Sequence, residues 1–250
     1  MLKARGWVNP AAATGLARVG AVEQQPDRRW IVLAAFAAVA IAVVAAVLIG
    51  RGGGSDEGDD AGSTQASAGG CAKVEAPEAK TVSFEAPDQV LKAGEDATAV
   101  VKTSCGTFEI ALDTERAPKT ANSFAFLAEE GFYDDLTFHR VAPDFVIQGG
   151  DPEGTGTGGP GYSVDEKPPP NLSYTKGIVA MAKSSADPPG RSGSQFYVVT
   201  APDAGLPPEY ALVGKVSEGY DVVEKIDALG TAGEKPKQTV LIEEVTIEQG

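Results

Sequence analysis

The chain has 250 residues, a formal net charge of −14 at pH 7, two cysteines and one histidine. This length is enough for one sizeable core with appendages, or for two small domains. Positions 1–29 carry a net charge of +3, so the remainder carries −17, which would repel phosphate backbones and argues against nucleic acid as a partner. A structural zinc site normally needs four cysteine or histidine ligands. The composition therefore predicts neither a metal site nor a cofactor.

Residues 30–49, WIVLAAFAAVAIAVVAAVLI, are apolar throughout and carry no charge. A helix of this length spans about 30 Å, the thickness of the hydrocarbon core of a bilayer. Arg28 and Arg29 precede this segment, and mostly acidic residues follow it. By the positive-inside rule we expect a single transmembrane helix with a cytoplasmic tail at 1–29 and an extracytoplasmic remainder. The sequence thus predicts a cell-membrane protein that contacts the lipid bilayer through residues 30–49.

The segment 50–70 contains almost no large apolar residue, so we expect a flexible linker rich in glycine, serine and acidic residues. Residues 71–96 follow as an N-terminal extension of the folded domain, with the character of an added strand. Cys71 and Cys105 would lie on the oxidising side of the membrane, which favours a disulfide between them. Such a bond would stabilise the domain by about 3–4 kcal/mol. Two unpaired structural thiols remain the alternative.

From position 97 onward, short apolar runs alternate with turn residues. Several runs are β-branched and alternate in polarity, which predicts strands at 97–103, 107–112, 145–148, 178–182, 195–200, 211–216 and 240–247. Two segments, 118–130 and 220–229, have helical periodicity; a proline suits the start of the first, and glycines follow both. Many short strands with two helices predict a mainly β domain over residues 97–250, a closed barrel or a sandwich with helical caps.

Two further patterns suggest chemistry but lack the context for it. The glycines of GTGTGGPG at 154–161 fit a dinucleotide-binding fingerprint, yet a proline follows where a helix should begin. A serine hydrolase would need a base beside Ser192 or Ser194, and His139 is the only histidine of the chain. We interpret the glycine-rich segment as a surface loop, and the two serines do not predict a hydrolase.

The segment 138–151, FHRVAPDFVIQGGD, resembles the signature of the cyclophilins, whose usual form is close to FHRIIPGFMIQGGD. The preceding APKTANSFAFLAEEGFYDDLT resembles the first helix of that family, and GTGTGGPGY resembles the loop after the signature. Further similar stretches are Met181–Ala182, GSQFYVVT at 193–200 and LPPEYALVGKV at 206–216. They occur in the same order as in the family, over roughly residues 97–248. The chain is identified as a cyclophilin-type peptidyl-prolyl cis-trans isomerase, a membrane-anchored and bacterial-like member.

The resemblance implies a closed eight-stranded antiparallel β-barrel capped by two α-helices, and an enzyme that accelerates rotation about X-Pro bonds. Amide resonance opposes that rotation with a barrier of about 18–20 kcal/mol. By resemblance Arg140 is the catalytic residue: a donor placed at the imide nitrogen stabilises the twisted transition state and not the planar ground state. No nucleophile is required. Taken alone, Arg140 would be interpreted as an ordinary surface cation.

The resemblance also implies a set of substrate-binding residues. Phe145 would form the floor of a proline pocket, with Val146 and Leu206 beside it. The amides of Gln148 and Gln195 would bind the peptide groups of the substrate. The remaining members of the set are Ala182, Lys183, Tyr197 and Tyr210.

The chain departs from the family pattern around this site. Asp144 stands where glycine is usual, and Lys183 with Ser184 replaces an Asn-Ala pair. Gly205 aligns where many members have tryptophan, and Tyr210 where many have histidine. The segment 181–195 is also longer than in the common cytosolic members, so the resemblance does not define this part of the pocket rim.

Three functions follow as hypotheses. The first is an isomerase that acts on proline-containing polypeptides among exported or surface proteins. The second is a non-catalytic proline-peptide-binding or chaperone module, and the third is an anchored scaffold protein. Arg140, Phe145 and Gln148 occur together, which favours the enzyme.

Overall fold

The structure is a computed structural model that describes residues 70–250. The predicted tail at 1–29, the predicted membrane helix at 30–49 and all but the last residue of the predicted linker at 50–70 lie outside the described residues. Among residues 70–250, no helix combines the length and apolar character needed to cross a membrane.

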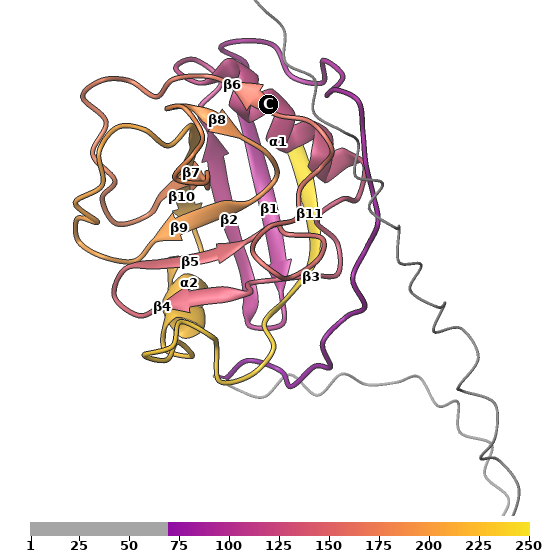
Figure 1. The fold of residues 1–250 in the computed structure, drawn as a ribbon, viewed down its shortest axis with the longest axis vertical. Helices are drawn as coiled ribbons and strands as arrows, with labels where there is room; N and C mark the ends of the chain where they lie inside the picture. Colours follow the sequence, from indigo (N-terminus) through magenta and orange to yellow (C-terminus); the bar gives the residue numbers. More distant parts are fainter. Residues whose placement is uncertain (1–69) are drawn as a thin grey trace, which may run out of the picture. The chain divides into compact units, whose positions relative to one another are not determined.

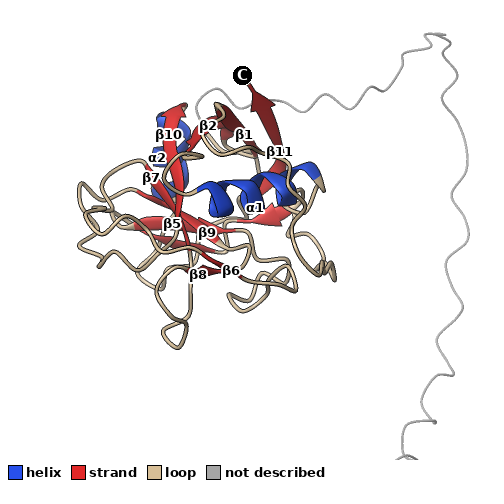
Figure 2. Cartoon of the chain, turned by 90° about the horizontal axis from the view of Figure 1, so that it is seen from above, coloured by secondary structure: helices blue, strands red, loops and turns tan. Residues whose placement is uncertain are grey.

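The described part of the chain forms one nine-stranded sheet, one two-stranded sheet and two helices (Figure 1). Figures 1 and 2 place α1 (Pro118–Glu129) at one end of the curled main sheet and α2 (Tyr220–Asp227) near the other. The strands are β1 (Ala97–Thr103), β2 (Gly106–Leu112), β3 (Leu136–Thr137), β4 (Arg140–Ala142), β5 (Val146–Gly149), β6 (Val164–Asp165), β7 (Ile178–Met181), β8 (Arg191–Ser192), β9 (Phe196–Val199), β10 (Leu212–Glu218) and β11 (Leu241–Gln249).

The sequence predicts seven strands and both helices, and each has a counterpart within a few residues of its predicted bounds. The four strands that the sequence does not reveal, β3, β4, β6 and β8, have only two or three residues each. Two or three residues are too few to show an alternating pattern, because side chains repeat on one face of a strand only every second residue.

The predicted closed eight-stranded barrel is wrong: the sheet curls but does not close. Its order is β3-β11-β1-β2-β10-β7-β9-β5-β4, so β3 and β4 are its two edges and do not pair with each other. These two strands are successive parts of one stretch of chain, separated only by Phe138 and His139. Because no turn lies between β3 and β4, the chain cannot fold back, and the two edge strands cannot pair with each other.

The interior core lies between the curled sheet and the two helices. Aromatic rings dominate it: Phe124 of α1 contacts Tyr133 and Phe196, with ring centroids 4.9 and 5.4 Å apart, and all three side chains are fully buried. From α2, Val222, Val223 and Ile226 enter the same core. Full burial of side chains of this size stabilises a fold by about 1.5–3 kcal/mol each.

A distant residue completes the start of α1. Pro118 occupies the first turn, and the helix has no capping side chain of its own. The carboxylate of Glu166, which follows β6, accepts hydrogen bonds from the backbone N–H groups of Lys119 and Thr120 at 3.1 and 2.7 Å. A carboxylate at this position satisfies orphan donors and complements the helix dipole. Tertiary structure therefore supplies the cap that the local sequence lacks.

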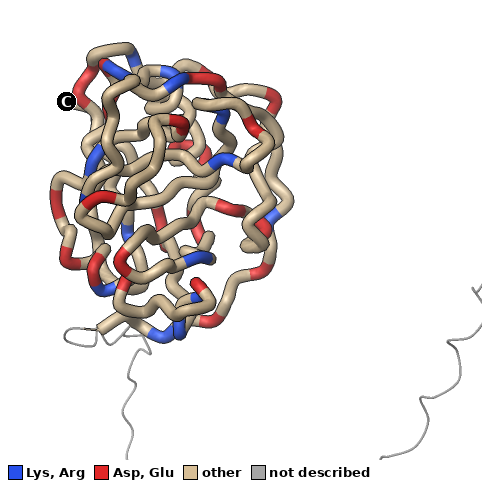
Figure 3. The backbone as a smooth tube through the Cα atoms, turned by 60° about the vertical axis from the view of Figure 1, so that its left-hand side comes forward, with Lys and Arg blue, Asp and Glu red and all other residues tan. Residues whose placement is uncertain are grey.

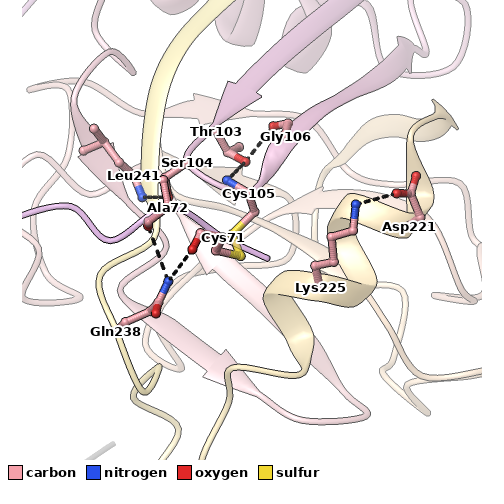
Figure 4. Close-up of a disulfide and its surroundings, with 10 residues drawn as sticks. All are labelled: Cys71, Ala72, Thr103, Ser104, Cys105, Gly106, Asp221, Lys225, Gln238 and Leu241. Atoms are coloured by element: carbon pink, nitrogen blue, oxygen red, sulfur yellow. Dashed lines mark hydrogen bonds and ion pairs between the residues drawn. A yellow bond between two sulfur atoms is a disulfide. The ribbon is translucent and has the colours of Figure 1, made fainter. Parts of the chain in front are cut away.

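Cys71 and Cys105 form a disulfide with an S–S distance of 1.98 Å (Figure 4). The bond fastens the start of the domain to the tight turn between β1 and β2. Around it, the Ala72 N–H donates to the carbonyl oxygen of Ser104 at 2.7 Å, and the Gln238 amide donates to the Cys71 and Ala72 carbonyls. The predicted pairing is thus present, and backbone contacts accompany it.

Residues 71–96, here called the strap, contain no strand, which corrects the expectation of an added one. The strap runs along the outside of the sheet (Figure 1) and makes isolated backbone hydrogen bonds instead of a ladder. The Lys80 N–H donates to Pro152, and the Phe84 N–H donates to Pro160. The ring of Phe84 packs edge-on against Phe126 of α1, with centroids 5.2 Å apart. The strap is therefore packed against the domain along its length.

Asn122 of α1 is the main polar link between helix and strap. Its side-chain oxygen accepts hydrogen bonds from Gln89 Nε2 and from the N–H groups of Val90 and Leu91, at 2.8–2.9 Å. Its amide nitrogen donates to the Asp88 carbonyl at 2.8 Å. Asn122 is buried, so this one amide acts for the strap as a peptide group of a neighbouring strand would.

We predict that Asn122→Ala lowers the free energy of unfolding by about 2–4 kcal/mol, because it leaves the buried N–H of Leu91 and the part-buried backbone groups of Val90 and Asp88 without partners. Glu129→Ala, at an exposed position of the same helix, should change it by less than about 0.5 kcal/mol. Denaturant titration of both variants measures the difference. Equal stability of the two variants would contradict the role of Asn122.

Candidate active site

Strand pairing places a row of side chains across four neighbouring strands. Arg140 of β4 is opposite Gln148 of β5, which is opposite Tyr197 of β9, which in turn is opposite Ala180 of β7. Residues directly opposite in antiparallel strands point to the same face of a sheet. The intervening residues Ile147, Phe196 and Val198 point the other way, into the interior core. The row therefore lies on the outer face of the sheet.

A smaller apolar cluster covers the same outer face and contains Val146, Ala180, Tyr197 and Val199. Above it is a cavity of about 200 Å³, small enough for a single side chain. Its lining residues are Arg140, Phe145, Val146, Gln148, Ala182, Lys183, Tyr197, Leu206 and Tyr210. The structure thus brings together every site residue named from the sequence except Gln195.

Gln195 lies in an adjoining cavity of about 320 Å³, which shares Gln148, Ala182 and Lys183 with the first. The side chains of Gln148 and Gln195 connect the two cavities, because Gln148 Nε2 donates to Gln195 Oε1 at 3.0 Å. Gln195 Nε2 in turn donates to the carbonyl oxygen of Gly158 at 2.9 Å. Together the two cavities form a surface that an extended peptide could follow past Gln148.

Arg140 is held at the border of the smaller cavity by three neighbours. Its Nη1 donates to Gln148 Oε1 at 3.1 Å, and its Nε donates to the Glu234 carboxylate at 2.7 Å. The guanidinium carbon lies 5.9 Å from the centroid of the Phe145 ring. Arg140 Nη2 makes no hydrogen bond to any residue between 70 and 250, so its two hydrogens are available to a ligand. The cavity thus combines an apolar floor with a cationic donor at its edge.

Lys183 forms the boundary between the two cavities. Its side chain is only 6% exposed, and its ammonium lies 3.5 Å from the Glu209 carboxylate and 5.5 Å from the centroid of the Tyr210 ring. It also donates to the carbonyl oxygen of Asp187 at 3.2 Å. These contacts hold the long side chain in place and leave its charge paired. Lys183 therefore acts as a wall of the site.

Three tyrosines support the apolar side of the smaller cavity. The Tyr174 hydroxyl donates to the Tyr210 carbonyl at 2.6 Å and accepts from the Tyr210 N–H at 3.0 Å, and burial raises the pKa of Tyr174 to about 12. The ring of Tyr197 packs against both, with centroids 6.4 and 5.7 Å away. The Tyr197 hydroxyl is buried and has no hydrogen-bond partner among the described residues. Burial accordingly raises the pKa of Tyr197 far above its usual range.

His139 lines neither cavity, although it precedes Arg140 in the chain. Both of its ring nitrogens are buried and find no hydrogen-bond partner within residues 70–250. Burial lowers the pKa of His139, which favours the neutral ring at pH 7. A neutral ring outside the cavity fits a structural role and not that of an acid or base.

The glycine-rich loop at 154–161 forms part of the larger cavity and is not a nucleotide site. The buried carboxylate of Asp151 accepts hydrogen bonds from the N–H groups of Glu153 and Gly156 and so holds the loop closed. A Cβ at Gly158 would lie 2.1 Å from Asp151 Oδ1, so only glycine fits there. The tight loop lets the Gly158 carbonyl approach Gln195.

Sequence reasoning missed two residues of the site. Glu234 contacts Arg140 from the loop between α2 and β11, and Tyr174 supports Tyr210 from the loop before β7. Neither belongs to a recognisable motif, and Glu234 lies 94 positions from its partner. No local pattern could have found them.

A curled antiparallel sheet, two helices and an arginine-bordered apolar pocket define the cyclophilin-like class. The profile of the family described as "Cyclophilin type peptidyl-prolyl cis-trans isomerase/CLD" matches residues 98–247. The chain therefore belongs to the cyclophilin-type peptidyl-prolyl cis-trans isomerases, a family of enzymes.

Relatives of the chain agree with this assignment. It is 40% identical over 135 residues to peptidyl-prolyl cis-trans isomerase-like 1 of Neurospora crassa, and the matched region covers 52% of this chain and 81% of the relative. It is 42% identical over 135 residues to peptidyl-prolyl cis-trans isomerase ppi1 of Schizosaccharomyces pombe, covering 52% of this chain and 85% of the relative. These relatives are fungal and give no support to the expectation of a bacterial-like member.

A solved structure shows the same fold. The crystal structure of a Cryptosporidium parvum cyclophilin type peptidyl-prolyl cis-trans isomerase, in the presence of the dipeptide Ala-Pro, has a TM-score of 0.57 and 30% sequence identity. The similarity covers 61% of this chain and 99% of that chain.

We predict that Tyr197→Phe leaves the free energy of unfolding unchanged or raises it by about 1 kcal/mol, because it removes a buried hydroxyl without a partner. The matched variant Tyr174→Phe removes a hydroxyl with two hydrogen bonds and should lower it by about 1–2 kcal/mol. Thermal or denaturant unfolding of both proteins decides this. A loss in Tyr197→Phe as large as in Tyr174→Phe would mean that the Tyr197 hydroxyl has a stabilising partner.

Proposed function

We propose that this chain accelerates rotation about X-Pro bonds of proline-containing polypeptides, with Arg140 as the catalytic residue. The observation that carries the proposal is the position of the Arg140 guanidinium over the Phe145 ring, at the edge of a cavity of about 200 Å³. A proline ring is apolar and compact, so Phe145, Val146 and Leu206 can enclose it. Arg140 would then lie beside the bond that rotates.

The chemistry requires a hydrogen-bond donor and no covalent step. Rotation breaks amide resonance, against a barrier of about 18–20 kcal/mol, and makes the imide nitrogen more basic in the twisted state. A donor at that nitrogen stabilises the transition state more than the planar ground state. Arginine suits the task because its guanidinium stays protonated and has a rigid set of N–H groups. Two of these groups are occupied by Glu234 and Gln148, and Nη2 remains for the substrate.

The other residues of the two cavities would hold the peptide on either side of the proline. Gln148 and Gln195 carry amides that can both donate to and accept from peptide groups. Lys183 and Ala182 border both cavities, so they would contact the backbone that crosses from one to the other. Tyr197 and Tyr210 would form the apolar wall facing the proline.

We predict that Arg140→Ala lowers kcat/KM for an X-Pro peptide by roughly 100- to 1,000-fold, the usual effect of removing a donor to the transition state. The side chain is partly exposed, so the fold should survive the change. A protease-coupled isomerisation assay measures the rate, and peptide binding is measured separately by NMR titration. Retained binding without acceleration supports the assigned role, whereas full activity of Arg140→Ala contradicts it. A wild type that binds without acceleration would instead be a non-catalytic proline-peptide-binding or chaperone module.

We propose further that the enzyme is anchored in the cell membrane through residues 30–49, and that its substrates are exported or surface proteins. The apolar character of that segment and the basic pair Arg28–Arg29 before it support an extracytoplasmic domain. The Cys71–Cys105 disulfide supports the same location, because disulfides persist in oxidising compartments.

We predict that a phosphatase reporter fused after Gly250 of the full chain is active, because such reporters fold only in an oxidising compartment. Activity of a cytoplasmic reporter alone would contradict this topology. Peptide mapping of the same material should recover Cys71 and Cys105 linked to each other, and free thiols there would count against an oxidising location.

A further inference from the structure

Glu234 makes a direct ion pair with Arg140 but lines neither cavity of the site. Its carboxylate accepts from Arg140 Nε at 2.7 Å, and the hydrogen bond to Arg140 lowers the pKa of Glu234, so it is ionised at neutral pH. The side chains are 32% and 48% exposed, so the pair lies at the protein surface. Exposed ion pairs contribute little to stability, which leaves the reason for this one open.

The backbone of Glu234 is held in an unfavourable conformation. Its φ is 60°, in the left-handed region that glycine, asparagine and aspartate tolerate better than glutamate. The other described non-glycine residues with positive φ are aspartates, Asp135 and Asp144. Two backbone hydrogen bonds fix the position: the Glu234 N–H donates to Thr231 at 2.9 Å, and its carbonyl accepts from the Val141 N–H at 2.7 Å.

These contacts attach Glu234 to β4 at Val141, the residue after Arg140. They hold the Glu234 carboxylate at a fixed position relative to the Arg140 guanidinium. On the opposite side, Gln148 accepts from Arg140 Nη1. Bonds at Nε and Nη1 together fix the plane of a guanidinium, which leaves Nη2 in one orientation. Without Glu234, the Arg140 side chain would keep one hydrogen bond and could rotate about its flexible stem.

We propose that Glu234 is a positioning residue for the isomerase reaction. It fixes the guanidinium of Arg140 in the orientation in which Nη2 faces the X-Pro bond of the substrate. The inference rests on the proposed role of Arg140. Glu234 acts through Arg140 and does not itself contact the peptide. A shift of a catalytic donor by about 1 Å can cost a large factor in rate, so a weak surface ion pair can matter for catalysis without mattering for stability.

The test compares Glu234→Gln and Glu234→Gly with wild type in the full chain. Both variants lack the carboxylate, and glycine also relieves the positive φ. We expect kcat to fall about fivefold in both, with KM changed by less than about twofold, because the lost contact orients a group that acts in the transition state. The melting temperature of Glu234→Gly should be equal to or above that of wild type. In NMR spectra, the Arg140 Nε–H signal should shift in both variants.

A matched control is Glu224→Gln, which removes an ion pair of the same length, 2.7 Å to Lys176, at similar exposure. Its kcat should equal that of wild type. Wild-type kcat in both Glu234 variants would overturn the proposal. A loss of kcat in Glu234→Gln together with wild-type kcat in Glu234→Gly would overturn it too, because glycine has no side chain that could orient Arg140.

A failure of the positioning role of Glu234 can be distinguished from a failure of the catalytic role of Arg140. If Arg140→Ala is inactive and the Glu234 variants are fully active, only the positioning role fails. If Arg140→Ala retains full activity, the assigned catalytic role fails first. In the double variant Arg140→Ala with Glu234→Gln, the Glu234 change should have no further effect, since there is no guanidinium left to orient.

Discussion

The alternation of side chains along β5, β9 and β7 is the constraint on which both the core and the site depend. Ile147, Phe196 and Val198 point into the interior, and their immediate neighbours point outward. Because the period of a strand is two residues, a register shift of one residue would exchange these sets and destroy both at once. The same hydrogen-bonded ladder that builds the core therefore fixes the distance between Gln148 and the rings of the outer face.

Arg140 lies where this ladder ends. It belongs to β4, the edge of the sheet, so only one neighbouring strand holds its backbone. An edge position leaves the side chain accessible to a ligand, and it also leaves the side chain in need of support from elsewhere. The loop that follows α2 supplies that support through Glu234, and the stretch Phe138–His139 joins the strand to the opposite edge. The open edge of the curled sheet is thus part of the proposed peptide-binding site.

The strap and the surface charges are features of the domain that lie outside the pocket. The strap is linked at its start by the disulfide and further along by Asn122, and none of its residues lines either of the two cavities of the site. In the view of Figure 3, acidic positions are spread over the domain and not gathered in one place. A dispersed negative charge favours solubility and disfavours polyanions as partners, but it selects no particular peptide.

The sequence by itself determined the family, the seven longer strands, both helices and nearly the whole set of pocket residues, because these are encoded in motifs and in periodic patterns along a single segment. Tertiary structure decided the rest. The open sheet depends on two edge strands too short to show a pattern, and the cap of α1 by Glu166 depends on a residue far away in the chain. Glu234 reaches Arg140 only because β4 and the loop after α2 are brought together. Contacts between residues so distant in sequence leave no local signal, since each partner alone looks like an ordinary surface charge.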